Sequence, residues 1–349
     1  MKAMMLWEPE RLELVDLPDE APGPGEVLLR VDACSVCGSD LEGYHGIHPK
    51  VTWPRVMGHE CACTVAALGP GVTGIAVGDR LAGTGAKACG ECGPCRGGDR
   101  SRCERPGGPG FTAHGAYAQW MTVLPRDLTP IPECISDEEA AVAQPICIAN
   151  HAVATRAAVR AGETVLVQGC GPIGLAAMIL SRRRGARVVS TDIVDYRCRR
   201  ARDLGADLAL NAHADDVLGA VKDLTGGRGA DKVIECVGGD QDETLAQAVR
   251  AVRPGGLIAV VGSFANDRAT VPIIDLKFNE KRILGSQSMP EGYEPVFALI
   301  RSGEVPARAL ITHRLPLAET RRALRLMDEK AEEVMKVVIF PNSGKGVGA

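Results

Sequence analysis

The sequence predicts an α/β protein of two domains, one rich in β-strands and one built on a doubly wound parallel sheet. Three observations predict this fold class: a length of 349 residues, a first part of short strands separated by Pro and Gly, and a second part in which strands alternate with helical stretches. Single hydrophobic cores stop growing at roughly 250–300 residues, so this length suits two packed cores. Hydrophobic residues make up 45% of the chain and charged residues 24%, which is typical of globular proteins.

The first part reads as an all-β segment over residues 1–140. Its strands are EVLLRVDAC, ECACTVAALG, DRLAG and YAQWMTVL, with turns at PGPGE and GPGVTG. From about residue 146 strand-like runs alternate with helical stretches, and this βαβ pattern covers residues 163–185, 186–206, 231–239 and 255–264. Such alternation predicts a parallel sheet.

After a strand at 281–286 come two helices, at 294–303 and 318–330. The closing strand KVVIF could rejoin the first domain, and the residues after it are typical of a frayed tail. We therefore expect domains at 1–146 and 147–288, with 289–349 returning to the first.

Charge and cysteine usage limit the partners. Lys plus Arg number 40 against 44 for Asp plus Glu, a net charge of −4, so we expect no nucleic-acid partner. The N-terminus has no basic start leading into an apolar run, and no uncharged stretch reaches the ~18 residues of a membrane span. We expect a cytoplasmic protein without a membrane partner, in which thirteen cysteines, an odd number, favour metal binding over disulfides.

A glycine motif predicts dinucleotide binding of the Rossmann type. It comprises Gly169, Gly171, Pro172, Ile173 and Gly174, directly after one strand and before one helix. The first Gly allows a tight turn, the second lets the backbone approach a pyrophosphate closely, and the third lets the helix pack closely on the strand. Asp192 closes the next strand, where a carboxylate accepts ribose hydroxyls and repels a 2′-phosphate, so NAD is favoured over NADP. Arg197 and Arg199 could soften that preference, and a plain glycine turn with a solvated Asp is the alternative.

Four cysteines predict a closed structural zinc site. They are Cys89, Cys92, Cys95 and Cys103. Four thiolates at such spacing surround one tetrahedral zinc with no open position. An iron–sulfur cluster and a nucleic-acid zinc ribbon are the alternatives, disfavoured by the wide last gap and by the acidic chain.

A mixed set predicts a second, open zinc site. Cys37 stands in the run Cys-Gly-Ser-Asp, and His59 and Glu60 follow a glycine in the same β-rich part. A single buried Cys or His is usually structural. Together, thiolate, imidazole and carboxylate leave zinc a position for water or substrate.

These three constellations, in this order, resemble the zinc-containing medium-chain dehydrogenase/reductase (alcohol dehydrogenase) family over the whole chain. The Cys-Gly-Ser-Asp motif and the His59-Glu60 pair are most similar to the polyol, threonine, glucose and aminocyclitol dehydrogenases. The resemblance implies a GroES-like catalytic domain with an inserted Rossmann coenzyme domain, and an active site between them. It also implies a homodimer or homotetramer, paired edge to edge near residues 283–286.

The resemblance assigns roles to individual residues. Cys37 and His59 would hold the catalytic zinc, with Glu60 as a third ligand that comes on and off. Ser39 would take the proton of the substrate hydroxyl, and Asp40 would orient His59. Gln144 stands where relatives supply a further ligand; an amide there resembles the glucose dehydrogenases and puts direct coordination in doubt, with Cys147 as a weaker substitute.

Other positions bear on the substrate. Glu42 replaces a His that completes the proton path in many members, so the relay differs. Ala86 replaces a His of the threonine dehydrogenases, although Asn150-His151 is similar to them. Tyr44 ends a pattern shared with aminocyclitol dehydrogenases, and Glu42, Tyr44, His45 and His48 could pair with substrate hydroxyls.

The expected function is zinc-dependent hydride transfer between a secondary alcohol and NAD, with two zinc ions per chain. The substrate expected is a small, polar, hydroxylated molecule such as a polyol, sugar, cyclitol or aminocyclitol. A threonine 3-dehydrogenase is the first alternative. A zinc-binding scaffold with a vestigial Rossmann domain, or a zinc-free reductase of the same fold, would have no use for Cys37 and His59.

Overall fold

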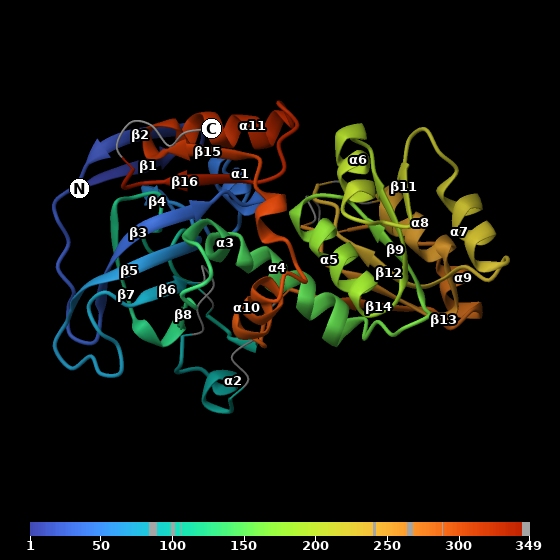
Figure 1. The fold of residues 1–349 in the computed structure, drawn as a ribbon, viewed down its shortest axis with the longest axis horizontal. Helices are drawn as coiled ribbons and strands as arrows, with labels where there is room; N and C mark the ends of the chain where they lie inside the picture. Colours follow the sequence, from blue (N-terminus) through green and yellow to red (C-terminus); the bar gives the residue numbers. More distant parts are fainter. Residues whose placement is uncertain are drawn as a thin grey trace. The chain divides into compact units, whose positions relative to one another are not determined.

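The computed structural model describes residues 1–83, 89–98, 102–105, 107–239, 242–263, 268–287 and 289–343. Ala86 and the tail beyond residue 343 lie outside the described residues. The chain divides into two compact units, and unit 1 joins Met1–Gln144 to Gly292–Ala349 while unit 2 is Pro145–Glu291. Figure 1 labels the elements of both units. The domain limits expected at 146/147 and 288/289 lie close to these divisions.

Unit 1 is built on two sheets. The smaller has the strand order β2-β1-β4, and the larger has the order β15-β16-β3-β5-β6-β8, with β7 also paired to β3. The strands are β1 (Lys2–Glu8), β2 (Arg11–Asp16), β3 (Val27–Ser35), β4 (Arg55–Val56), β5 (Glu60–Leu68), β6 (Arg80–Gly83), β7 (Trp120–Val123), β8 (Leu128–Pro130), β15 (His313–Pro316) and β16 (Val337–Phe340). The closing strand of the chain thus rejoins the first part, since β16 pairs antiparallel with β3.

The register around β3 brings distant segments together. Ser35, the last residue of β3, lies opposite Glu60 on one side and opposite Val338 on the other. Aliphatic side chains from these strands and from α11 form one buried cluster beneath the sheet. This close packing of mostly aliphatic side chains gives the ends of β3 and β5 a rigid base.

Helices interrupt the segment that we expected to be all β, so that expectation was wrong in part. The helices that interrupt it are α1 (Gly38–Tyr44), α2 (Gly93–Arg96) and α3 (Asp137–Ala141), with a 3₁₀ turn at Pro125–Asp127. The other helices of unit 1, α10 (Glu294–Arg301) and α11 (Thr320–Glu329), lie where helices were expected, with 3₁₀ turns at Ala307–Leu310 and Leu317–Glu319. In α3, Ser136 accepts a hydrogen bond from the N–H of Glu139, whose carboxylate accepts one from the N–H of Ser136. This reciprocal cap gives hydrogen-bond acceptors to backbone N–H groups at the helix start that have no partner within the helix, and it thereby stabilises the start of α3.

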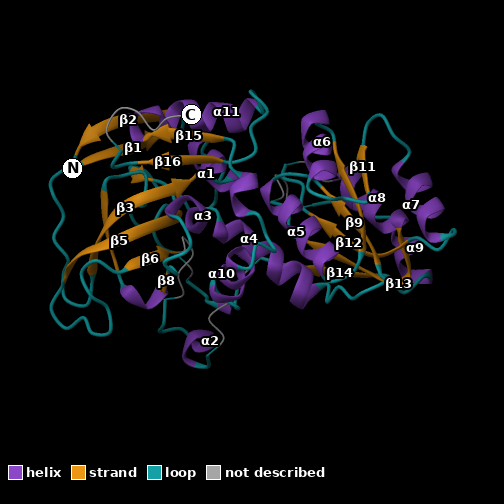
Figure 2. Cartoon of the chain, viewed as in Figure 1, coloured by secondary structure: helices purple, strands orange, loops and turns teal. Residues whose placement is uncertain are grey.

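Unit 2 is a six-stranded parallel sheet with the order β11-β10-β9-β12-β13-β14. Its strands are β9 (Thr164–Gln168), β10 (Arg187–Asp192), β11 (Leu208–Asn211), β12 (Ala230–Glu235), β13 (Val252–Val260) and β14 (Arg282–Gly285). Its helices are α5 (Pro172–Arg183), α6 (Asp195–Asp203), α7 (Val217–Thr225), α8 (Asp242–Ala251) and α9 (Ile273–Phe278), and α4 (Ala143–Asn150) leads into it through a π-helical segment at His151–Arg156. Figure 2 shows the strands flanked by helices. Strand order reverses at β9, where doubly wound sheets bind ligands.

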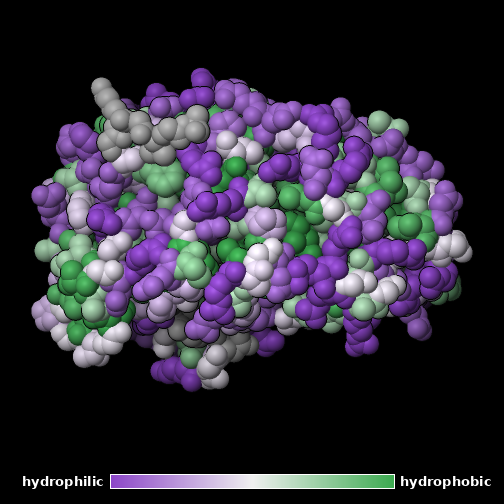
Figure 3. Space-filling model, in the orientation of Figure 1, coloured by the Kyte–Doolittle hydropathy of each residue, from purple (hydrophilic) through white to green (hydrophobic). Residues whose placement is uncertain are grey.

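The face of the molecule in Figure 3 is mostly hydrophilic. Apolar atoms gather there over the loop that leaves β5, where Leu68 and Val77 are exposed. None of the helices in the described ranges is long and apolar enough to cross a membrane.

Candidate active site

The mixed set of the sequence comes together in unit 1. Cys37 follows β3, and His59 and Glu60 stand at the start of β5, so the antiparallel pairing of the two strands joins them. One ligand atom from each of the three residues lies within 4.8 Å of the others. His59 and Glu60 are buried, and Cys37 is partly exposed.

Asp40 organises this set from the first turn of α1. Its carboxylate accepts hydrogen bonds from the N–H of Cys37 at 2.9 Å and from the hydroxyl of Tyr117 at 2.8 Å. The second oxygen accepts the N–H of Gly58 at 3.3 Å and lies 3.5 Å from Nδ1 of His59. Burial lowers the pKa of His59, but the charge and hydrogen bonding of Asp40 and Cys37 together raise that pKa well above its usual value. Asp40 thus turns the Nδ1 edge of the ring toward itself and leaves Nε2 for the opposite side.

Glu60 has a buried counter-ion that the sequence did not reveal. Lys336, directly before β16, places Nζ 2.5 Å from Oε2 of Glu60, and both side chains are almost fully buried. Ser35 also donates its hydroxyl to Oε2 of Glu60. The other carboxylate oxygen, Oε1, is buried and has no hydrogen-bond partner among the described residues. Glu60 therefore has one anchored oxygen and one uncommitted oxygen.

These donors fit a zinc ion. Thiolate, imidazole and carboxylate are ligands that zinc accepts, and three protein ligands leave a fourth position open. Unpartnered buried polar atoms are uncommon in folded proteins, and here both Oε1 of Glu60 and Nδ1 of His59 lack hydrogen-bond partners in the described part of the chain. A zinc ion bound to Oε1 of Glu60 would give that oxygen the partner it lacks.

Four further expected residues surround or approach the set. Ser39 and Glu42 both lie in α1, three residues apart and partly buried, and burial raises the pKa of Glu42. Gln144 is the second residue of α4. Cys147 is buried and belongs to unit 2. The geometry thus groups Cys37, His59 and Glu60. The expected parts of Gln144 and Cys147 stay predictions.

The four-cysteine set forms a separate cluster in unit 1. One sulfur atom from each of Cys89, Cys92, Cys95 and Cys103 lies within 4.8 Å of the others, and all thirteen cysteines of the chain are free thiols. The Sγ atoms of Cys92 and Cys103 are 3.9 Å apart. A tetrahedron with Zn–S bonds of about 2.3 Å has edges of about 3.8 Å, so the spacing fits zinc and is far too long for a disulfide. Backbone N–H groups of Glu91 and Cys92 lower the pKa of Cys89 to about 6, which favours its thiolate.

The glycine motif of unit 2 joins β9 to α5 as expected. Gly169 has φ +85°, and a Cβ there would lie 3.1 Å from the backbone of Cys236. A Cβ on Gly174 would lie 1.7 Å from the carbonyl oxygen of Gly169, so only glycine lets the helix approach the turn. A Cβ on Gly171, the N-cap of α5, would meet nothing within 4 Å. Pro172 and Ile173 open the helix, and the N–H groups that follow Pro172 in the first turn are of the kind that binds a pyrophosphate.

Asp192 ends β10 beside this turn. Its two carboxylate oxygens accept the N–H of Cys170 at 2.8 Å and of Val194 at 3.0 Å, which ties the glycine turn to the next strand. Nη1 of Arg197 lies 3.9 Å from the same carboxylate. Each carboxylate oxygen keeps a second lone pair, so Asp192 can also accept a ribose hydroxyl.

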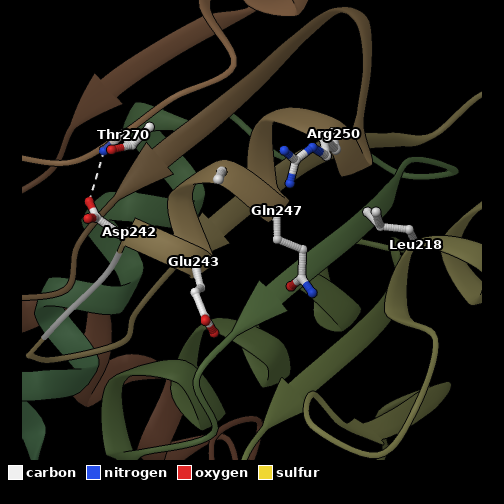
Figure 4. A pocket seen from close by; sticks show the side chains of 7 residues that line it. Leu218, Asp242, Glu243, Gln247, Arg250 and Thr270 are labelled. Atoms are coloured by element: carbon white, nitrogen blue, oxygen red, sulfur yellow. Dashed lines mark hydrogen bonds between the residues drawn. The ribbon is translucent and has the colours of Figure 1, made fainter.

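A surface hollow of about 380 Å³ lies elsewhere on unit 2, and Figure 4 shows its lining side chains. It lies against α8, with Asp242 accepting the N–H of Thr270 at 2.8 Å. None of the residues expected to bind metal or cofactor lines it. The hollow therefore takes no part in the site.

Three residues that bond to Glu60 or Asp40 were missed from the sequence: Ser35, Tyr117 and Lys336. Tyr117 and Lys336 bond to Asp40 and Glu60 from segments far away in the chain. A readable signal existed only for Lys336, a lone cation directly before the apolar strand at 337–340.

Comparison with known proteins matches both units. The family model described as "Alcohol dehydrogenase GroES-like domain" matches residues 23–133, and the model described as "Zinc-binding dehydrogenase" matches residues 172–302. A sorbitol dehydrogenase of Halalkalibacterium halodurans is 33% identical over 328 residues, which cover 93% of this chain and 94% of that protein. An L-threonine 3-dehydrogenase of Pyrococcus horikoshii is 32% identical over 86% of this chain and 87% of its own length.

Solved structures give the same picture. A zinc-binding dehydrogenase of Sinorhizobium meliloti 1021, bound to NADP, has a TM-score of 0.90 at 28% identity, with 97% of this chain and 99% of that chain covered. An alcohol dehydrogenase of E. coli CFT073, complexed with NADH, has a TM-score of 0.89 at 28% identity and covers 98% and 99%.

Proposed function

This chain belongs to the zinc-containing medium-chain dehydrogenase/reductase (alcohol dehydrogenase) family, and we propose that it transfers a hydride between a secondary alcohol and NAD at Cys37, His59 and Glu60. The observation that carries this proposal is the convergence of those three side chains on one point with an unpartnered carboxylate oxygen. A scaffold protein would have no need to keep such a set together with an intact glycine cradle.

Two zinc ions per chain fit the two donor sets. The catalytic ion would be held by Cys37, His59 and Glu60. The structural ion would be held by the four cysteines and would tie together the stretch of chain that carries them. When bound, the catalytic zinc supplies Lewis acidity that lowers the pKa of a substrate hydroxyl, and the nicotinamide supplies the hydride acceptor. Gln144 is not an obligatory ligand, because a neutral amide adds little to this set.

The protein residues act on position and protons. Asp40 orients His59. Lys336 holds Glu60 through one carboxylate oxygen and leaves the other oxygen without a hydrogen-bond partner among the described residues. Ser39 takes the hydroxyl proton of the substrate. Glu42 then receives it, since side chains three residues apart on a helix are neighbours and burial gives this carboxyl a raised pKa.

NAD is the cofactor we propose, over NADP. The carboxylate of Asp192 would accept the ribose hydroxyls and repel a 2′-phosphate, while Arg197 is already drawn toward that carboxylate. Known relatives of this fold include one bound to NADP and one complexed with NADH, so the preference rests on Asp192 itself.

The substrate we propose is a small, polar, hydroxylated molecule such as a polyol, sugar, cyclitol or aminocyclitol. Support comes from the relatives named sorbitol dehydrogenase and from polar side chains that follow Cys37 in the chain. Reduction of NAD should be measured across polyols, aldoses, aminocyclitols, threonine and straight-chain primary alcohols. Higher specificity constants for the polyhydroxylated compounds support the proposal, and a clear preference for the simple alcohols or for threonine overturns it.

We propose a homodimer or homotetramer that forms through the free edge of the parallel sheet. Strand β14 ends the sheet order, and α9 beside it exposes Ile273, Ile274 and Phe278. Such an edge with apolar neighbours favours pairing with a second copy. Sedimentation equilibrium measures the assembly size, and a monomer at micromolar concentration would contradict this assignment. The expected cytoplasmic location stays a prediction.

A further inference from the structure

Four polar residues follow the Cys-Gly-Ser-Asp motif, and the structure separates their roles. His45 is held between two carboxylates, with Nδ1 3.1 Å from Glu10 and Nε2 3.0 Å from Asp328. Tyr44 packs against the hydrophobic cluster of unit 1. Both side chains are therefore engaged in stabilising unit 1, which leaves Glu42 and His48 as the candidates for contact with a substrate.

His48 is joined to the metal set by a stack of rings. Its imidazole lies 4.9 Å from the ring of Phe111, and the ring of Phe111 lies 4.8 Å from the imidazole of His59. The backbone holds it in place, since the N–H of His48 donates to the carbonyl of Glu42 at 3.1 Å. A half-buried His48 thus stands one ring away from a candidate zinc ligand.

The hydrogen bonding of His48 leaves one donor unused. Nδ1 accepts the N–H of Lys50 at 3.2 Å, so the neutral ring must carry its proton on Nε2. Burial, Lys50 and His59 lower the pKa of His48, which favours the neutral ring. Among the described residues, none accepts a hydrogen bond from Nε2. A half-buried donor of this kind is stabilised when a ligand supplies the acceptor.

We propose that His48 is a specificity-determining residue, whose Nε2–H donates a hydrogen bond to a second, non-reacting hydroxyl of the substrate. The inference rests on the proposed function and narrows it to alcohols that carry a further hydroxyl near the reacting carbon. A site with a fixed donor rejects analogues that lack the matching oxygen, because its donor is then left unpaired.

The test compares alcohols that differ by one hydroxyl. The probes are cyclohexane-1,2-diol against cyclohexanol and butane-2,3-diol against butan-2-ol. His48→Phe keeps a ring against Phe111 and removes the donor, and His48→Gln retains an N–H at similar reach. His45→Phe is the matched control, three residues away and engaged elsewhere. Zinc content and the urea midpoint are measured for each variant, with His48→Leu as a substitute if phenylalanine disturbs folding.

We expect His48→Phe to lose roughly tenfold in kcat/KM on the diols, mainly through KM, because a bond to a non-reacting group contributes uniform binding. The simple alcohols should change by less than about twofold, His48→Gln should recover most of the loss, and His45→Phe should keep the preference for the diol. Equal losses on diols and simple alcohols, or a glutamine variant no better than phenylalanine, would overturn the role of His48. A wild-type protein that oxidises neither member of either pair would instead contradict the proposed function.

Discussion

Replacing Lys336 with Met should strongly destabilise unit 1, because it leaves the carboxylate of Glu60 buried without its cation. The pair is separated by 2.5 Å, and the lysine side chain is 3% exposed while that of Glu60 is fully buried. Methionine preserves most of the aliphatic stem, so the change isolates the charge. Breaking a buried ion pair on one side costs about 3–5 kcal/mol, and we expect about 3 kcal/mol in the free energy of unfolding.

Tryptophan fluorescence in urea is the appropriate assay. The three tryptophans of the chain, Trp7, Trp53 and Trp120, all lie in unit 1, so the signal reports the unfolding of that unit alone. The double variant Lys336→Met/Glu60→Gln should recover a large part of the loss, since both charges are gone. Lys2→Met is the matched control: its pair with Asp16 is exposed, so its loss should cost less than about 1 kcal/mol. A Lys336→Met protein within about 0.5 kcal/mol of wild type, or a strictly additive double variant, would refute the reasoning.

Three further outcomes are expected. Burial lowers the pKa of His45, but Glu10 and Asp328 together raise it above its usual value, so the stability that His45 contributes is complete below the unfolded value of about 6.5 and is lost as pH rises through the raised folded value. The difference in urea midpoint between wild type and His45→Gln should therefore shrink from about pH 6.5 upward, and a constant or growing difference would contradict this. Gly174→Ala should lower the free energy of unfolding of unit 2 by about 2 kcal/mol, measured by circular dichroism. Gly171→Ala should leave that stability unchanged and weaken NADH binding in a fluorescence titration, and equal losses of stability in the two variants would contradict the separate roles of the two glycines. Asp192→Ser should raise NADPH use relative to NADH in steady-state kinetics, and a wild-type enzyme that already prefers NADP by a large margin would contradict the role of Asp192.

Local patterns in the sequence were enough for two of the three constellations. The glycine motif and the four cysteines are each confined to a short stretch, so their spacing alone brings their atoms together. The parallel sheet was equally readable, because β9 and β10 are apolar runs that lead directly into the motif and into Asp192.

The catalytic set needed tertiary information. Cys37 and Glu60 lie close together because β3 and β5 pair with Ser35 opposite Glu60. The pattern of apolar and polar residues in the sequence does not specify which residues of the two strands lie opposite each other. Lys336 arrives through β16, which pairs with the far side of β3. The sequence therefore allowed the three donors to be grouped by chemical type and by resemblance, whereas the pairing of Lys336 with Glu60 depends on how β16 pairs with β3.

The missed helices have a simpler cause. The reciprocal cap between Ser136 and Glu139 was a readable start for α3. Cys37 is the N-cap of helix α1, and its N–H donates to the carboxylate of Asp40. Gly38 and Gly43 lower the intrinsic helix propensity of α1. Tertiary contacts around Asp40 override that propensity.

Zinc analysis of purified Cys37→Ala protein, combined with alcohol-dependent reduction of NAD, tests the central claim most directly. The variant loses one ligand of the open set and leaves the four-cysteine cluster intact. We predict two zinc ions per chain in the wild type, one in the variant, and no measurable alcohol oxidation by the variant. Loss of both ions, or full activity with one ion, would contradict the assignment of separate structural and catalytic sites.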